Sequence, residues 1–477
     1  MQNRDIQRVP LGPLNMLFLL GYLLAGLSIN PLETAWMVFT LQLTLRFFWW
    51  QKISPILVVV LLFPWLEVHF NVLEANYFHV DLKDLFPSKT GGKTYWIASG
   101  GYLAVLGGLR LGLRKLFPVL ADAMCSVESS LRQFSQYRIL ILIAGLHILE
   151  SVAISSLGWG SVFRQLATYF SGIRIALMLT LFIHYAHTKK RGWLIWSFLL
   201  VELVLSFYSF FGSWKMPVVL FVLGLGATIE RIRTKEIVVF TPIILGVFAL
   251  TFVWQSVKMD YRMLLNNEQR AQSIQISREE ALTSFFELSK QAFQATEQER
   301  QTVVSSTFRR IGYLEYYAGA VKNVPQQVEH TNGSLLIDNL TFALVPRFLN
   351  PDKGVKNDLA KVEEFTDYRF GENPYSSFSL GHYCEAYIDW GPLGSVLHLF
   401  VFGLLGAVLV GLTMKLRPEV HPVLVWSILF VVMTPWGTMQ QDAITVFGKV
   451  FWNTLCQLVL FKPLYMRISR FISPNES

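Results

Sequence analysis

Five basic side chains in or beside a polar region of the chain have the chemistry to bind a pyrophosphate. They are Lys215, Arg309, Arg310, Arg347 and Lys353. A guanidinium group binds phosphate through a planar pair of donors, and an ammonium group binds it as a point charge. Arg347 and Lys353 belong to Pro-Arg-x-x-x-Pro-x-Lys, which is more specific than an isolated arginine. The alternative is that each residue is a solvated charge or the ion-pair partner of a nearby acid.

Three titratable residues further along the chain are candidates for a general base. His382, Glu385 and Asp389 stand at steps of three and four, so in a helix they share one face. A histidine or a carboxylate there is able to take the proton from an attacking hydroxyl group. The alternative is that these residues orient arginines or cap the helix that follows.

A second group of charged residues lies inside apolar runs. It consists of His147, Glu150, Arg174 and Glu202. A charge at the centre of a membrane helix costs about 2.5–3.5 kcal/mol on insertion scales and usually faces an interior or a cavity. We expect Arg174 to form an ion pair with Glu150 or Glu202. The alternative is that these residues line a path for a lipid phosphate or a sugar.

The elements that must position these residues are membrane helices. The chain is 53% hydrophobic and 16% charged, whereas soluble proteins carry about 25% charged residues. About 20 helical residues cross a bilayer. Twelve runs of that kind are predicted near residues 14–30, 31–48, 54–70, 94–117, 138–158, 162–187, 192–211, 214–230, 237–257, 391–414, 421–440 and 444–464. The first run has no cleavage site and is interpreted as a retained signal anchor.

The orientation follows from the lysines and arginines of the short loops. With the N-terminus in the cytoplasm, 20 of these residues face inward and five face outward. This asymmetry is typical of membrane proteins, whose cytoplasmic loops are the basic ones. Both termini are therefore predicted to be cytoplasmic, and the formal net charge of +8 does not indicate a nucleic-acid partner.

The predicted organisation has three parts. Residues 1–257 form an N-terminal membrane bundle of about nine helices, residues 258–390 form a large extracytoplasmic loop region, and residues 391–477 form about three more helices and a short tail. In the loop region, the spacing of apolar residues from Ser277 to about Val321 predicts a helix, and Ser277-Arg278-Glu279-Glu280 has the capping-box pattern. The second half of the region is predicted to be irregular, because Gly and Pro recur in it.

Several patterns are absent from the sequence. It has no phosphate-binding glycine loop, no His-Glu-x-x-His and no Asp-x-Asp in the loop region. We therefore expect no metal, no cofactor and no nucleotide-activated sugar, so a transferase outside the cytoplasm would take its donor from a lipid carrier. Paired glycines at Gly100-Gly101 and Gly107-Gly108 predict close helix packing.

These residues resemble bacterial polysaccharide polymerases of the O-antigen (Wzy) type, the oligosaccharide repeat unit polymerase family. The resemblance rests on the many spans with one large outer loop late in the chain, and on three motifs at residues 212–215, 346–353 and 385–394. The family usually has Gly-Ser-Arg at the first motif and Pro-Arg-x-x-x-Pro-x-Lys-Pro at the second. Here Lys215 replaces the arginine and Gly354 replaces the last proline.

The resemblance implies an all-α polytopic membrane protein of GT-C-like architecture, in the bacterial inner membrane, with about 12 helices and a periplasmic loop region that is partly helical. It implies a metal-independent glycosyltransferase that moves a glycan from undecaprenyl pyrophosphate to a lipid-linked repeat unit in the synthesis of a lipopolysaccharide or another envelope polysaccharide. Lys215, Arg309, Arg310, Arg347, Lys353 and Arg174 would bind pyrophosphate or glycan, and an acid or histidine among Glu385, His382 and Asp389 would activate the acceptor.

The resemblance also implies partners, namely membrane lipids, a chain-length regulator and a flippase. Three other functions remain open from the sequence. A polysaccharide ligase has the same architecture. A flippase or transporter would show inverted repeats, and no repeat is evident. A non-catalytic component of an envelope-assembly complex would need none of the candidate residues.

Overall fold

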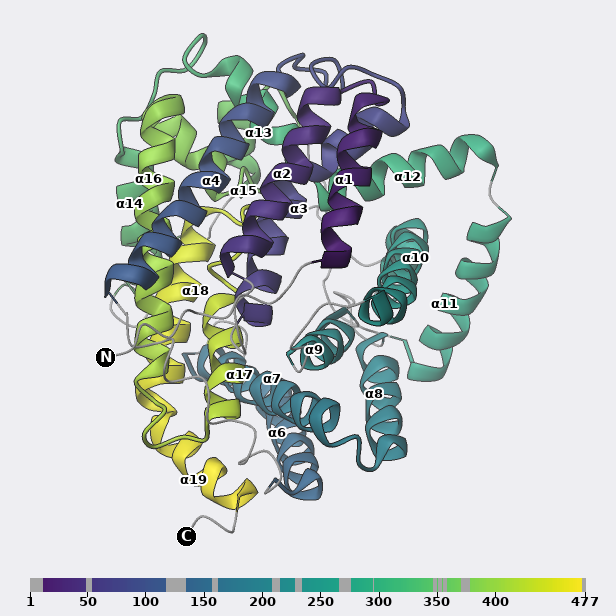
Figure 1. Cartoon of the computed structure of the whole chain (residues 1–477), viewed down its shortest axis with the longest axis vertical. Coiled ribbons are helices and arrows are strands. Elements are labelled where there is room, and N and C mark those ends of the chain that lie inside the picture. Colours follow the sequence, from purple (N-terminus) through teal and green to yellow (C-terminus); the bar gives the residue numbers. More distant parts are fainter. Residues whose placement is uncertain are drawn as a thin grey trace.

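The structure is a computed structural model. It describes residues 12–48, 54–116, 134–156, 162–207, 215–227, 234–265, 276–294, 296–345, 350, 354, 358–369 and 378–473. The described residues form helices and their connections, with no strand (Figure 1). The all-α class predicted from the sequence is thus confirmed. Arg347 and Lys353 lie outside the described residues.

The N-terminal bundle and the helix that leaves it occupy the chain up to residue 265, and each predicted apolar run overlaps one helix. These helices are α1 (Gly12–Gly26), α2 (Pro31–Phe48), α3 (Ser54–Tyr77), α4 (Gly91–Leu116), α6 (Gln136–Ser156), α7 (Val162–Thr188), α8 (Gly192–Phe207), α9 (Lys215–Gly226) and α10 (Thr234–Leu265).

The remaining helices comprise the polar region and the C-terminal membrane part. They are α11 (Arg278–Phe293), α12 (Glu297–Ile311), α13 (Glu315–Asn323), α14 (Ser334–Leu344), α15 (Asp358–Phe365), α16 (His382–Met414), α17 (Pro422–Met433), α18 (Ala443–Leu455), the π-helix η4 (Cys456–Leu460) and α19 (Lys462–Ile472).

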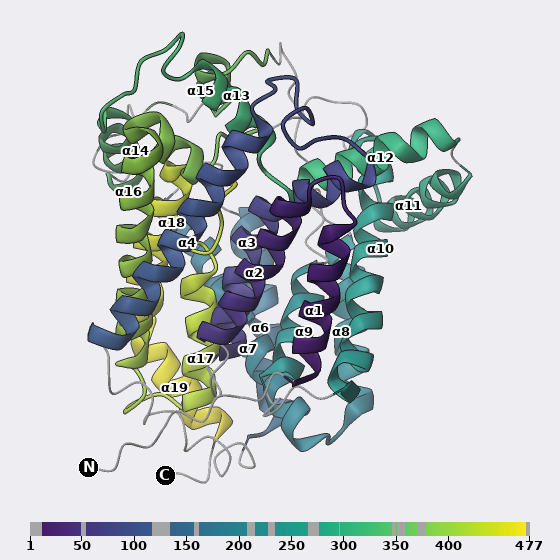
Figure 2. The same ribbon diagram turned by 45° about the horizontal axis from the view of Figure 1, so that its top comes forward.

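Among the described residues, six helices are long and apolar enough to cross a membrane, as in a multi-pass membrane protein. These spans are Ile56–Tyr77, Gly91–Lys115, Tyr169–Thr188, Thr241–Lys258, His382–Met414 and Ala443–Leu460. Five shorter apolar helices accompany them in the described part. Of the helices of the polar region, α13 and α15 lie at one end of the bundle and α11 and α12 project to one side, whereas α19 lies at the other end (Figure 2).

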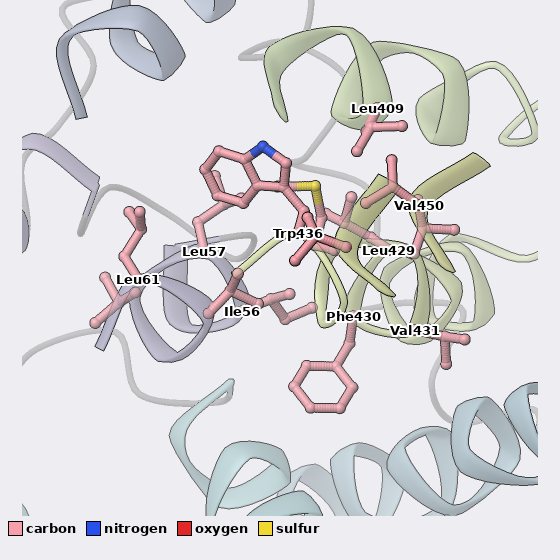
Figure 3. Packing of buried hydrophobic residues seen from close by; sticks show 14 of the residues in the cluster. Ile56, Leu57, Leu61, Leu409, Leu429, Phe430, Val431, Trp436 and Val450 are labelled. Atoms are coloured by element: carbon pink, nitrogen blue, oxygen red, sulfur yellow. The ribbon is translucent and has the colours of Figure 1, made fainter. Parts of the chain in front are cut away.

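The C-terminal membrane helices pack into a hydrophobic core with α3 and α4. Ile56, Leu57 and Leu61 of α3 face a cluster from α16, α17 and α18 that surrounds Trp436 (Figure 3). Trp436 is 2% exposed and its indole N–H donates to the Phe402 carbonyl at 3.0 Å. The core is therefore continuous across helices that are far apart in the chain.

The paired glycines bring α4 and α16 into close contact. A Cβ atom added at Gly108 would overlap the Phe400 carbonyl, and one added at Gly403 would overlap the Val105 carbonyl. Only hydrogen atoms fit between the two backbones there, which is the use of small residues in membrane helix packing. The close packing predicted from Gly107-Gly108 is confirmed.

The first half of the polar region is helical as predicted, but it is divided into three helices. The Ser277 hydroxyl accepts from the Glu280 N–H at 3.2 Å, so the predicted cap is present at the start of α11. A full capping box of Thr296 and Glu299 begins α12, and α12 ends at Gly312. These caps break the predicted single helix.

The prediction of an irregular second half is wrong, because α14 and α15 lie there. α14 descends beside α18: the Trp452 indole N–H donates to the Ala343 carbonyl at 3.2 Å, and Gly448 is close to Ala343. Seven of the 11 residues of α14 are hydrophobic, as expected for a short helix packed along membrane helices. Its sequence is Ser334-Leu335-Leu336-Ile337-Asp338-Asn339-Leu340-Thr341-Phe342-Ala343-Leu344. The polar region is therefore partly embedded in the bundle.

Candidate functional site

Four basic residues from three helices form a basic cluster. They are Lys215, Lys258, Arg262 and Arg310, and the positive charge of Arg310 acts on each of the other three. Burial, and then the charge of Arg310, lower the pKa of Arg262. Like charges held together in this way favour an anion between them, because an anion relieves their mutual repulsion.

The positions of the cluster residues follow from the local sequence. Lys258 and Arg262 are four residues apart on α10 and share one face of that helix. α10 is held against α11 by a small hydrophobic cluster that includes Trp254, Tyr261 and Ala281. Arg310 stands in the last turn of α12, and Lys215 is the first residue of α9.

Arg309 points to different partners from those of its neighbour Arg310. Its Nε lies 3.5 Å from Glu74 Oε1, and its Nη1 lies 3.2 Å from Glu315 Oε1. Glu74 is 1% exposed, so Arg309 compensates a buried acid. The sequence predicts that five basic residues meet. Of those that the structure describes, Lys215 and Arg310 belong to the basic cluster. Arg309 instead forms ion pairs with Glu74 and Glu315.

The buried Glu67 connects the basic cluster to the loop between α17 and α18. Arg310 acts electrostatically on its carboxylate. That carboxylate accepts hydrogen bonds from the Met439 N–H at 2.6 Å, the Thr438 hydroxyl at 3.2 Å and the Gln440 N–H at 3.3 Å. Glu67 therefore holds the loop between α17 and α18 in place and also interacts with Arg310 of the basic cluster.

Glu385 fixes the end of the same loop from α16. The side chain is 3% exposed, and its Oε1 accepts from Lys361 Nζ at 3.2 Å. Its Oε2 accepts from the Ala443 N–H at 2.6 Å and from Asn339 Nδ2 at 3.4 Å. Lys361 Nζ also donates to Asn339 Oδ1 at 2.6 Å and lies 3.9 Å from Asp442 Oδ2. One lysine thus serves two buried acids.

His382 lies one helical turn before Glu385 and is 1% exposed. Its ring is 5.2 Å from the His398 ring and 4.6 Å from the Phe402 ring, measured between centroids. Neither ring nitrogen has a hydrogen-bond partner among the described residues. A buried imidazole whose nitrogens lack such partners can form hydrogen bonds with a bound molecule, as donor or as acceptor.

Asp389 caps α14. Its Oδ1 accepts from the Thr331 hydroxyl at 2.5 Å and from the Gly333 and Leu335 N–H groups at 3.1 and 3.2 Å. Its Oδ2 accepts from the Leu336 N–H at 3.0 Å. These contacts occupy both oxygens with the first turn of a helix. Asp389 therefore has a positioning role. Glu385 also has both oxygens hydrogen-bonded, but two of its three donors are the side chains of Lys361 and Asn339, so it stays a candidate for proton transfer with His382.

Arg174 forms the ion pair expected from the sequence. Its Nε lies 3.1 Å from Glu150 Oε2 and its Nη1 lies 3.3 Å from Glu202 Oε2. The three residues connect α6, α7 and α8. We assign Arg174 to the packing of the membrane bundle.

An apolar groove extends from the region of His382 along α14, α16 and α18. Two adjoining cavities, of about 450 and 570 Å³, share Leu340, Leu405 and Phe447. The first is lined also by Trp390 and His398, and the second reaches Lys415 and Lys462 at the far end of α16. The groove therefore passes from one end of these helices to the other, and we call it the α14–α18 groove.

Sequence reasoning missed Lys258, Arg262 and Lys361. The predicted span ends at residue 257, whereas α10 continues to Leu265, so the four-residue step of Lys258 and Arg262 on one helix was the signal that could have found them. Lys361 belongs to a helix that was not predicted. Among the described residues, no group of three His, Cys, Asp or Glu side chains is placed to hold a metal ion.

Comparison with known proteins gives a family without an assigned activity. No curated protein and no solved structure matches the chain. The family described as a domain of unknown function (DUF8712) matches residues 69–469. This match includes α4 to α18 with the basic cluster, Glu385 and the α14–α18 groove. Since it covers most of the chain, the protein belongs to the DUF8712 family.

Proposed function

We propose that the protein is a polysaccharide polymerase. It transfers a glycan from undecaprenyl pyrophosphate to a lipid-linked repeat unit at the outer face of the bacterial inner membrane. The observation that carries the proposal is that His382 lies against His398 of the apolar groove, one helical turn before the buried Glu385. Glu385 and Glu67 both bind the connection between α17 and α18, and Arg310 of the basic cluster acts on Glu67. Such a site suits a substrate with a long apolar tail and a charged, hydroxyl-rich head.

The reaction has one displacement step. The acceptor hydroxyl oxygen attacks the anomeric carbon of the donor and forms the new glycosidic bond. The bond from that carbon to the pyrophosphate oxygen breaks, and its electron pair leaves with the pyrophosphate. The hydroxyl proton goes to Glu385 or His382. The basic cluster stabilises the leaving charge, and Arg347 and Lys353 are proposed to join it.

The architecture completes the proposal. Twelve spans in a GT-C-like arrangement place both termini in the cytoplasm and the polar region in the periplasm. A cysteine introduced at Asn332, with Cys384 replaced, is then labelled by a membrane-impermeant thiol reagent in spheroplasts, and one introduced at Thr234 is not. Labelling at Thr234 alone would invert the topology.

The neighbouring arginines of α12 provide a matched test of the basic cluster. Arg310→Ala removes a cluster charge, and Arg309→Ala removes a charge that is paired with Glu74 and Glu315. A charge-assisted hydrogen bond contributes about 1.5–3 kcal/mol, so we expect polymer formation to fall by about tenfold or more in Arg310→Ala. Arg309→Ala takes a cation from the buried Glu74 and lowers stability, but the polymer formed per folded protein is expected to stay at the wild-type value. Equal loss in both variants, at equal protein levels, would refute the role of the cluster.

Lys258 extends the same test. Lys258→Ala is expected to weaken the binding of the lipid-linked donor, whereas Lys258→Arg retains most of it because the charge remains. Donor affinity is measured with purified protein. A Lys258→Ala variant with unchanged affinity would remove this residue from the site.

The base is tested by Glu385→Gln and His382→Gln. We expect the variant that lacks the base to lose turnover far more than donor affinity, since proton transfer contributes about 10²–10⁴-fold to a rate. If both variants polymerise at the wild-type rate, the base lies elsewhere. A chelator is expected to have little effect, and a strong metal requirement contradicts the mechanism.

The surface glycan of a deletion strain distinguishes the related functions. A product with a single repeat unit supports a polymerase, long chains that are not attached to their acceptor indicate a ligase, and the absence of exported repeats indicates a flippase. A normal glycan in the deletion strain would show that the protein has no role in the synthesis of this glycan.

A further inference from the structure

A polar pocket lies between α6 and α7 and the start of α8. It is at the end of the bundle where α19 lies (Figure 2), because the Ser135 N–H before α6 donates to the Ile472 carbonyl of α19 at 3.2 Å. Its volume is about 720 Å³, and it is lined by Gln136, His184, His187, Lys190 and Arg191 among others. Helices α13 and α15 of the polar region are at the opposite end (Figure 2). We call this cavity the α7–α8 pocket, and its occupant differs from the substrate of the proposed transfer.

The α7–α8 pocket is basic. Among the described residues, no carboxylate forms an ion pair with His187, Lys190 or Arg191. The Arg191 guanidinium carbon instead lies 4.3 Å from the centre of the Tyr137 ring, which leaves its donors available. A cavity with two lysine or arginine side chains and two histidines attracts an anion.

The backbone at the pocket adds to this preference. α8 begins at Gly192, directly after Arg191, and the N-terminus of a helix favours an anion. Lys189 and Arg191 both have positive φ angles, of 55° and 52°. Residues with side chains adopt this conformation only at a cost in energy, and such positions cluster at binding sites. The turn therefore presents Lys190 between two constrained residues.

Gln136 supplies an independent observation. The residue is 3% exposed, and its Nε2 donates to the Lys190 carbonyl at 3.2 Å. Among the described residues, its Oε1 has no hydrogen-bond partner. A buried acceptor without a donor is costly, so a ligand of the pocket should carry a hydroxyl or another donor next to its negative charge.

We propose that the α7–α8 pocket binds a phosphate ester whose organic part carries a hydroxyl group. Lys190, Arg191 and the histidines hold the phosphate, and Gln136 Oε1 accepts from the hydroxyl. The head group of phosphatidylglycerol and a soluble sugar phosphate share this chemistry. Both can reach an opening at this end of a membrane protein.

The first experiment measures the binding of soluble probes to the purified full-length protein by calorimetry. Glycerol 3-phosphate is expected to bind more tightly than methyl phosphate, which lacks the hydroxyl groups. Lys190→Ala is expected to raise the Kd of both probes by about tenfold or more, as for a lost charge-assisted hydrogen bond. Arg470→Ala removes another exposed charge at the same end of the molecule and should leave both Kd values unchanged.

The second variant tests the ligand's hydroxyl group. Gln136→Leu keeps the volume of the side chain but removes the acceptor. We expect it to abolish the preference for glycerol 3-phosphate over methyl phosphate, with methyl phosphate bound as in the wild type. A general unfolding of the variant would weaken both probes together, so the ratio of the two Kd values separates the outcomes.

A lipid arm identifies the source of the phosphate. The protein is reconstituted in phosphatidylcholine nanodiscs with and without phosphatidylglycerol, and retained lipid is counted by native mass spectrometry. Retention of phosphatidylglycerol that depends on Lys190 assigns the pocket to a lipid, and soluble probes that bind in its absence assign it to a soluble ester. If neither arm gives saturable binding that depends on Lys190, or if Arg470→Ala has the same effect, the proposal is wrong.

Discussion

The removal of Lys361 is the sharpest test of how the acidic site is held together. Lys361→Met keeps the aliphatic stem and removes the charge that lies 3.2 Å from Glu385 and 3.9 Å from Asp442. The side chains of these acids are 3% and 2% exposed. The variant therefore leaves two buried carboxylates close together without their shared cation.

The magnitude follows from the burial of the pair. Removing one partner of a buried ion pair costs about 3–5 kcal/mol. The Lys361 side chain is 19% exposed, so water can relax around the site and we expect a loss near the lower end, about 3 kcal/mol. Glu385→Gln in the Lys361→Met background removes one of the two buried carboxylate charges. The double variant should therefore be more stable than the sum of the two single changes indicates.

The assay is urea unfolding of the protein in detergent, followed by tryptophan fluorescence, with wild type, both single variants and the double variant. The coupling free energy is expected to be about 1–3 kcal/mol. A loss below about 1 kcal/mol in Lys361→Met, as for an exposed pair, would show that the ion pair does not support the site. Additive single changes would refute the shared-cation reasoning.

Three further changes have distinct expected outcomes. Gly108→Ala forces α4 and α16 apart and should lower the melting temperature, whereas Gly107→Ala, whose added Cβ would lie 3.8 Å from its nearest neighbour atoms, should not; equal melting temperatures would contradict the packing. Asp389→Ala removes the cap of α14 and should raise hydrogen exchange there, by about 1 kcal/mol of lost protection; unchanged exchange would leave the cap without a role. Arg174→Gln should lower stability without a selective loss of polymer, and loss of polymer at normal protein levels would instead indicate a substrate path.

The sequence predicts where the apolar helices lie because their signal is local, although only six of the described helices are long and apolar enough to cross a membrane. An apolar run is recognisable within about 20 residues. The pair Gly107-Gly108 likewise predicts a close helix contact even when the partner helix is not known. The ion pair of Arg174 is also predictable, since an arginine inside a span requires a nearby acid.

The candidate site is less predictable because its contacts join distant segments. Asp389 has the residue type and spacing of a base, but its partners, such as Thr331 and Leu336, lie more than 50 residues earlier. Lys361 stands in a helix flanked by turn-forming residues, and nothing near it in the sequence indicates Glu385. Arg309 and Arg310 are adjacent and basic, yet only packing decides that one meets Glu74 and the other meets the basic cluster.

The contact between α4 and α16 has a consequence for the biogenesis of the protein. Gly108 and Gly403, which meet at this contact, are nearly 300 residues apart in the chain. During synthesis, α4 enters the membrane long before its partner has been made, and its small-residue face remains in contact with lipid or with an insertion factor. In chains truncated before α16, the small-residue face of α4 would therefore stay without its partner helix. Membrane quality control is expected to recognise this face and to degrade the truncated chain.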